Sequence, residues 1–183
     1  MRKWISVVAL VLILAGVNWS IASKEKHIAS GRTAYLKLMP VDPRSLMQGD
    51  YMALRFELAG KIAEQLPKDK ENKIRRLRHK IAAGDGFVVA VLDKDNVALF
   101  KTLYQDDMQL AENEIKMQYR VRNGKVKFAT NAYFFQEGTA KVYEKAKYGQ
   151  FRVNDIGEIL LVDMYDEKLM LLNADTDEKE PAR

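Results

Sequence analysis

Few side chains in this sequence could act as nucleophiles. There is no cysteine, and every serine lies before residue 46. A serine or cysteine nucleophile needs a neighbouring base, most often a histidine, and the sequence contains only His27 and His79. We therefore expect no catalytic site built on a serine or a cysteine. The serines are Ser6, Ser20, Ser23, Ser30 and Ser45.

The two histidines are also the first candidates for a metal site. Each lies among charged residues, so we expect both side chains to be exposed to solvent. A shared metal site is the alternative, but neither histidine has further His, Asp or Glu residues at a spacing typical of metal ligands. The glycines of Gly84-Asp85-Gly86 precede a predicted strand rather than a helix, which excludes a phosphate-binding loop there. The sequence therefore predicts no metal and no cofactor.

Two carboxylates lie beside a glycine at the end of a predicted strand. Asp50 follows Gly49, and Glu137 precedes Gly138. Asp and Glu at such positions commonly accept hydrogen bonds from the backbone of a turn. The alternative is a general acid or base, which would require Asp50 and Glu137 to converge in one cleft. Both interpretations stay open at the level of the sequence.

The N-terminal segment has the features of a membrane anchor. Residues 4–23 carry no charge, and about 20 apolar residues suffice to cross a bilayer. Trp4 and Trp19 lie near the ends of this segment, as interfacial aromatic residues do. The preceding Arg2-Lys3 predicts a cytoplasmic N-terminus, with the rest of the chain periplasmic or extracellular. The alternative is a cleaved signal peptide, because Ser20-Ile21-Ala22 fits the small-x-small cleavage rule.

Beyond this segment, most of the patterns are those of β-strands. Alternating apolar and polar residues predict strands over 33–39 and 51–58. A continuous apolar run predicts a buried central strand over 86–93. Asn123-Gly124 predicts a two-residue hairpin turn, because both of its central residues need a positive φ.

Two short helices are predicted between these strands. Apolar residues from Leu58 to Leu66 have helical spacing, and Pro67 ends that helix. A second helix is predicted over 72–83. Strands separated by short turns and a small helical insertion predict an α+β fold, mainly antiparallel β. We expect a membrane anchor over 1–23, one extracytoplasmic β-rich domain over 24–174 and a polar tail over 175–183.

Positive charge is concentrated in two places. The net charge of +5 is too small by itself to indicate nucleic-acid binding. Residues 61–80 hold eight Lys or Arg and three Asp or Glu, a local net charge of +5, and the predicted hairpin carries more cations on one face. Both places are either solvated surfaces or a binding surface for an acidic partner or anionic headgroups. The candidate binding residues are Arg75, Arg76, Arg78, Arg120, Arg122, Lys125 and Lys127.

The segment from Pro40 to Leu58 contains several residues that restrict the conformation of the backbone. Pro43 restricts the backbone, Gly49 permits a tight entry and Asp50 can bond backbone amides at the start of the strand. Tyr51 and Leu54 have opposite parity, so we expect them on opposite faces, with Tyr51 as a half-exposed contact. The segment therefore predicts a corner that sets the register of a sheet.

Two separate segments carry a resemblance to a known family. GDYMALRF, preceded by VDPRSLMQ, resembles the signature of the GDYXXLXY family of bacterial membrane-anchored proteins, with Phe56 in place of the last tyrosine. YFFQEGTAKVYE, residues 133–144, resembles the second recurring segment of that family. The candidate motif residues, structural or in contact with a partner, are Pro43, Gly49, Asp50, Tyr51, Leu54, Glu137 and Gly138.

The resemblance implies a partner rather than a reaction. Genes of this family often stand beside those of multi-pass membrane proteins, so the expected function is a non-catalytic accessory or interaction module for an integral membrane protein. A looser similarity to signal peptidases, in DPRSLMQGDYMAL, places Val41 or Asp42 where those enzymes have their nucleophile. The alternatives are therefore a cell-surface enzyme that uses carboxylates and an inactive relative of signal peptidases.

Overall fold

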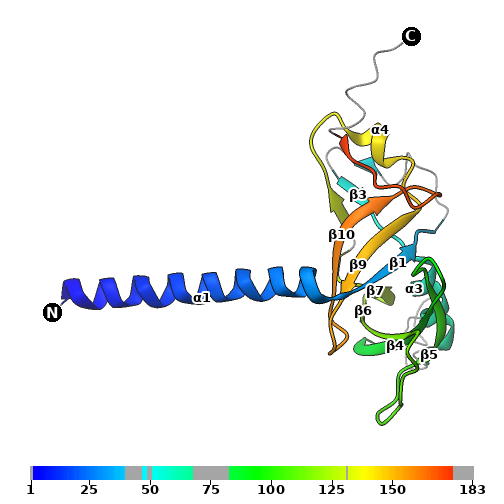
Figure 1. Cartoon of the computed structure of the whole chain (residues 1–183), viewed down its shortest axis with the longest axis horizontal. Helices are drawn as coiled ribbons and strands as arrows, with labels where there is room; N and C mark the ends of the chain where they lie inside the picture. Colours follow the sequence, from blue (N-terminus) through cyan, green and yellow to red (C-terminus); the bar gives the residue numbers. More distant parts are fainter. Residues whose placement is uncertain (1, 40–46, 49–50, 68–82, 131, 175–183) are drawn as a thin grey trace, which may run out of the picture.

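A single long helix projects from a body of strands (Figure 1). The computed structural model of the chain describes residues 2–39, 47–48, 51–67, 83–130 and 132–174. Helix α1 runs from Arg2 to Ser30, so it continues without a break past Ser23, where the uncharged segment ends. Within it, Val7–Ser30 is long and apolar enough to cross a membrane. Trp4 and Trp19 are 75% and 81% exposed, because no described part of the body covers this length of the helix.

The described strands of the body form three antiparallel sheets. The first has the order β1-β9-β10 and contains β1 (Arg32–Lys37), β9 (Tyr148–Val153) and β10 (Ile159–Tyr165). The second has the order β2-β3-β8 and contains β2 (Met47–Gln48), β3 (Tyr51–Ala53) and β8 (Ala132–Phe134). The third has the order β5-β4-β6-β7 and contains β4 (Gly84–Leu92), β5 (Ala98–Leu103), β6 (Glu114–Arg122) and β7 (Lys125–Lys127).

Two short helices complete this part of the chain, α3 (Glu57–Gln65) and α4 (Ala140–Tyr143). Leu58 and Ile62 of α3 are buried at helical spacing, and Pro67 follows the end of the helix. The predicted helix over 72–83 lies outside the described residues. An apolar N-terminal helix and mostly antiparallel strands confirm the predicted α+β fold.

The best-predicted elements are those with strong local signals. Strand β4 lies inside its sheet and is buried on both faces at Val88, Val89 and Ala90. Asn123 and Gly124 have φ of 55° and 70°, so the turn between β6 and β7 has the predicted conformation. A two-residue turn of this type fixes the register of its strands.

The strand predicted over 51–58 is much shorter than expected. Strand β3 ends at Ala53, and α3 begins at Glu57. Leu54 and Phe56 remain buried, but of these link residues only Phe56 forms an isolated bridge, to Leu38. From Glu57 onward the chain is helical instead, and α3 buries Leu58 and Ile62, one turn apart, on its inner face.

Phe56 joins segments that are far apart in the sequence. Its ring lies 6.0 Å from that of Phe128, just after β7, and 5.4 Å from that of Phe151 in β9, both with edge-on geometry. All three side chains are buried, and Phe56 itself is 3% exposed. The link between β3 and α3 is therefore held in the core where the first and third sheets meet.

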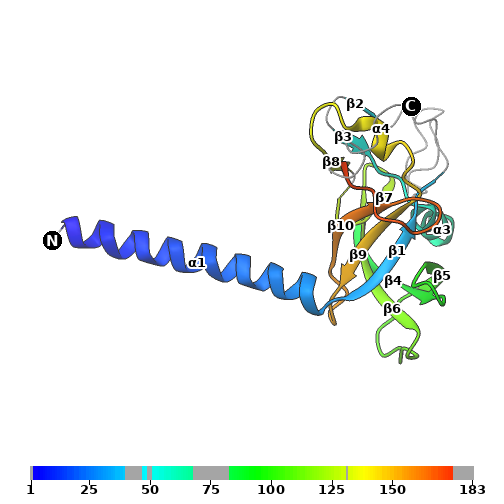
Figure 2. The same cartoon turned by 45° about the horizontal axis from the view of Figure 1, so that its top comes forward.

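Figure 2 shows α1 leading into β1, beside β9 and β10. The N–H of Gly31 donates to the carbonyl of His27 at 2.9 Å and closes the last turn of the helix. The C-terminal end of α1 contacts both β9 and β10. The helix therefore meets the body as part of its folded structure.

Truncation of the Phe56 side chain tests this view of the core. Phe56→Ala should lower the free energy of unfolding by about 3–5 kcal/mol, because it removes a buried ring and leaves a cavity between Phe128 and Phe151. Denaturant unfolding of the purified protein measures the change. The matched control is Arg55→Ala, whose exposed side chain predicts a change within about 0.5 kcal/mol. Equal stability of the two variants would contradict a core role for Phe56.

Candidate functional site

A groove of about 720 Å³ lies between α3, strand β7 and residues 53–56, which are the last four residues of GDYMALRF and are called the motif segment below. Leu54 and Phe56 form its floor, and both are buried. Ala59, Gly60 and Ala63 of α3 form one wall with small side chains. This groove brings together two features that the sequence predicted separately, the family motif and the basic hairpin.

The charge along the groove has one sign. Arg55, Lys125 and Lys127 line it, and none of the lining residues that the structure describes is acidic. In the described part of the chain, none of these three side chains makes an ion pair. The groove therefore combines an apolar floor with a cationic rim.

Tyr51 lies away from this groove, against β8. Its side chain is half-buried in β3, and its ring centroid lies 5.7 Å from that of Phe134. Phe134 is 74% exposed, so the pair presents aromatic surface to solvent. Pro43, Gly49 and Asp50, the other motif residues of this segment, lie outside the described residues.

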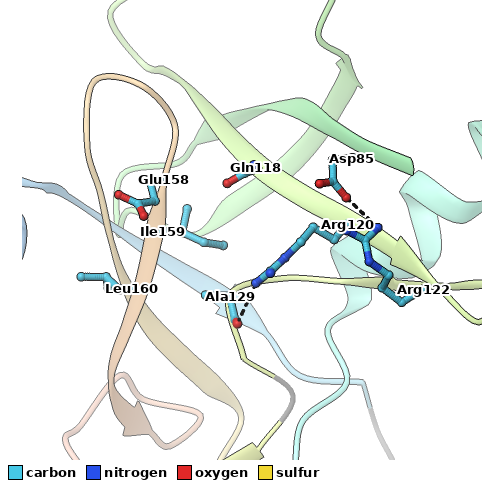
Figure 3. A pocket seen from close by; sticks show the side chains of 8 residues that line it. All are labelled: Asp85, Gln118, Arg120, Arg122, Ala129, Glu158, Ile159 and Leu160. Carbon is cyan, nitrogen blue, oxygen red and sulfur yellow. Dashed lines mark hydrogen bonds and ion pairs between the residues drawn. The ribbon is translucent and has the colours of Figure 1, made fainter. Parts of the chain in front are cut away.

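The two arginines of the hairpin line a second, polar cleft of about 320 Å³ (Figure 3). Arg122 Nη1 lies 2.7 Å from Asp85 Oδ1, and Arg120 Nη2 donates to the carbonyl of Ala129 at 3.3 Å. Glu158 lines the same cleft on its opposite side, so the described lining holds two arginines and two carboxylates. This cleft does not have the cationic surplus of the groove.

The basic surface predicted on the hairpin is therefore divided. Arg120 pairs with Lys127 and Arg122 with Lys125 across the β6–β7 ladder, which places like charges opposite each other. Such pairs are mildly destabilising. The contact of Arg122 with Asp85 offsets part of that repulsion. The other predicted cations, Arg75, Arg76 and Arg78, lie outside the described residues.

The expectation that His27 is exposed was wrong. Its side chain is buried, its Nε2 lies 3.1 Å from the carbonyl of Arg152 and its Nδ1 lies 3.7 Å from Glu158 Oε2. The sequence did not reveal this because the burial arises where α1 packs on β9 and β10, more than 100 residues further along the chain. Among the described residues, no group of three His, Cys, Asp or Glu could hold a metal ion. His79 lies outside them.

Glu137 lies in an exposed turn. Gly138 has a φ of +85°, a conformation that favours glycine. The N–H and the hydroxyl of Thr139 both donate to the carbonyl of Gln136, at 3.1 and 2.6 Å. Asp50, the carboxylate with which Glu137 would have to converge in an acid–base site, lies outside the described residues.

The buried carboxylate that sequence reasoning missed is Glu114, at the start of β6. The Lys101 side chain donates a hydrogen bond to it, which lowers the pKa of Glu114 below its usual value. The N–H of Ala111 donates to the same carboxylate at 3.2 Å. A lowered pKa and two local donors describe a structural ion pair and not a proton donor. No local sequence pattern marks this position.

The second family segment forms an aromatic cluster. The ring of Tyr143 stacks on Phe135 at 5.0 Å and lies 5.2 Å from Tyr133. Burial raises the pKa of Tyr133 well above its ordinary value and also raises that of Asp163. The phenol of Tyr133 is therefore neutral at physiological pH, and its ring serves packing.

Comparison with protein families matches residues 13–164 to the family described as GDYXXLXY protein. Comparisons with curated proteins and with solved structures found no match. Nothing in them supports the looser resemblance to signal peptidases. The family match spans most of α1, the motif segment, the hairpin and nearly all of β10. The chain belongs to the GDYXXLXY family.

Proposed function

We propose that this protein is a membrane-anchored, non-catalytic interaction module that serves as an accessory subunit of an integral membrane protein. In this proposal α1 spans the membrane, with the N-terminus in the cytoplasm and the body in the periplasm or outside the cell. The observation that carries it concerns α1. This helix exposes its apolar side chains, and its C-terminal end contacts the body.

The fastening consists of polar contacts between α1 and the β9–β10 hairpin. Lys24 Nζ lies 3.1 Å from Glu158 Oε1, and His27 contacts the carbonyl of Arg152. Just beyond the end of α1, Arg152 Nη1 also donates to the carbonyl of Gly31 at 3.2 Å and to Thr33 Oγ1 of β1 at 2.7 Å. Contacts from two successive turns of a helix restrain its direction, so the body has a defined orientation relative to α1.

The length of α1 supports a position of the body at the membrane surface. From Ser23 to Ser30 the helix rises by about 10 Å at its regular pitch. The headgroup layer outside the hydrocarbon core is about 5–7 Å thick on each side. If the uncharged residues 4–23 span the core, β1 begins just outside the headgroups, where it is within reach of a multi-pass protein.

The carboxylates favour an interaction module over the alternative of a carboxylate enzyme. Among the described residues, Glu114 is paired with Lys101, Glu158 with Lys24 and Asp85 with Arg122. The hydrogen bonds from Lys101 and Lys24 lower the pKa values of Glu114 and Glu158, which makes these two carboxylates poor general acids at neutral pH. An interaction module would recognise its partner through the surface of its body.

The proposed orientation is tested with a reporter fused after Arg183. An alkaline phosphatase reporter, which folds only outside the cytoplasm, should be active, because Arg2 and Lys3 retain the short end inside. The fusion should also remain in the membrane fraction with residues 1–23 intact. Deletion of residues 4–23 is the control and should abolish activity. An active reporter on a soluble, shortened protein would favour the cleaved signal peptide instead.

The accessory role is tested by photo-crosslinking in the native membrane. A crosslinking residue at Phe134 or Lys125, both on the surface of the body, should capture one defined integral membrane protein, identified by mass spectrometry. Lys94, in the turn after β4, provides a matched exposed control position. Recovery of only soluble proteins, or of the same mixture from all three positions, would contradict the proposal.

The junction of α1 with the body predicts a dependence of stability on pH. The hydrogen bond from Lys24 lowers the pKa of Glu158 below the ordinary value of 4.5. A carboxylate with a lowered pKa in the folded state stabilises that state above the ordinary value, and this contribution is lost as pH falls through the lowered pKa. Below about pH 4.5, the midpoint temperature of thermal unfolding should therefore fall more steeply with decreasing pH in the wild type than in Glu158→Gln. Glu167→Gln, at an exposed turn, should follow the wild type.

A further inference from the structure

From the groove we infer the chemistry of a partner segment: an extended acidic peptide with apolar side chains, added as a strand to the outer edge of β7. This inference rests on the proposed function, since it names the surface and the partner chemistry of the interaction module. It is carried by the edge of β7 that no described strand pairs with, by the apolar floor of the groove and by the single sign of charge on its described lining.

The backbone of β7 can accept another strand. Strand β7 is the last strand of its sheet. In a hairpin closed by a two-residue turn, Arg122 and Lys125 exchange hydrogen bonds, so the next pair, Val121 and Val126, does not. The N–H and carbonyl of Val126 therefore point away from β6. Among the described residues no hydrogen bond outside the ladder satisfies them.

The side chains around this edge suit alternating apolar and acidic residues. An added strand directs every second side chain to the same face, which here is the floor formed by Leu54, Phe56 and Phe128. Its remaining side chains lie beside Lys125 and Lys127 at the rim. Acidic residues at those positions complement two lysines that make no ion pair within the described part of the chain.

The two acidic residues of α3 do not cancel this charge. Glu57 and Glu64 belong to α3, but neither lines the groove. Glu57 lies 3.4 Å from Lys37, on the side of β1. The small residues of α3 leave space, because a Cβ added at Gly60 would meet no other atom within 4 Å. An added strand therefore has both room and an attractive potential.

The test uses the full chain in phosphatidylcholine nanodiscs and a fluorescent peptide in which Glu and Leu alternate. Anisotropy should show saturable binding, and the counterpart with Lys in place of Glu should not bind. Lys125→Glu combined with Lys127→Glu should weaken binding about tenfold or more, because repulsion replaces attraction. The matched control is Lys94→Glu with Lys168→Glu, two exposed turn lysines remote from the groove, and should bind as the wild type does.

Three further variants separate groove binding from general charge attraction. Gly60→Leu fills the groove and should abolish binding, whereas Lys61→Leu places the same side chain on the exposed side of α3 and should not. Val126→Pro removes the outward N–H without touching a ladder bond, so it should also weaken binding. Circular dichroism establishes that each variant is folded. Unchanged binding by folded Gly60→Leu would overturn the inference.

Other occupants give distinct results. Displacement of the peptide by anionic vesicles would assign the groove to lipid and overturn the inference. Tighter peptide binding after removal of residues 175–183 would identify the acidic tail of this chain as the occupant, with the same consequence. If photo-crosslinking from Phe134 captures an integral membrane protein while the groove variants have no effect, the proposed function stands and the groove is not its docking site.

Discussion

The contact of Phe56 with Phe128 and Phe151 is the interaction on which the rest of the body depends. These rings come from the link before α3, the segment after β7 and the middle of β9, so a single buried contact aligns two sheets and a helix. The same link positions Leu54 and Phe56 as the floor of the groove. The described part of the family motif therefore has a structural role that also creates a surface. A position that the motif gives as tyrosine can be phenylalanine because the ring is what the core requires.

The junction between α1 and the body has a different chemistry for a physical reason. The junction follows the apolar part of α1 and contains Lys24, His27 and Glu158. In a membrane, headgroups and water would surround this part of the protein. Polar contacts can restrain a helix there without the cost of burying charges in hydrocarbon. In the interaction module that we propose, a restrained α1 would let the body present the same face to a neighbour in the membrane at every encounter.

The two strands of the hairpin show how pairing decides which charges remain available. Arg122 is satisfied by Asp85, and Arg120 by a carbonyl, inside a cleft whose charges balance. Lys125 and Lys127 lie opposite those arginines in the ladder and have no carboxylate beside them in the described structure. Within the described part of the chain, Lys125 and Lys127 therefore leave positive charge without an ion-pair partner at the edge of β7. An edge strand flanked by lysines resists pairing with a copy of itself, yet it suits an acidic strand.

The sequence by itself determined the features that depend on local chemistry. The uncharged segment predicted α1, Asn123-Gly124 predicted the hairpin and its register, the apolar run predicted β4, and GDYMALRF identified the family. Tertiary structure decided what depends on contacts between distant segments: β3 stops at Ala53 because Leu58 and Ile62 are buried as a helix, and His27 is buried because α1 packs on β9 and β10. The division of the basic hairpin between a neutral cleft and a cationic groove was decided in the same way. Periodicity reports which side of an element is apolar, but only the folded chain determines which other element covers that side.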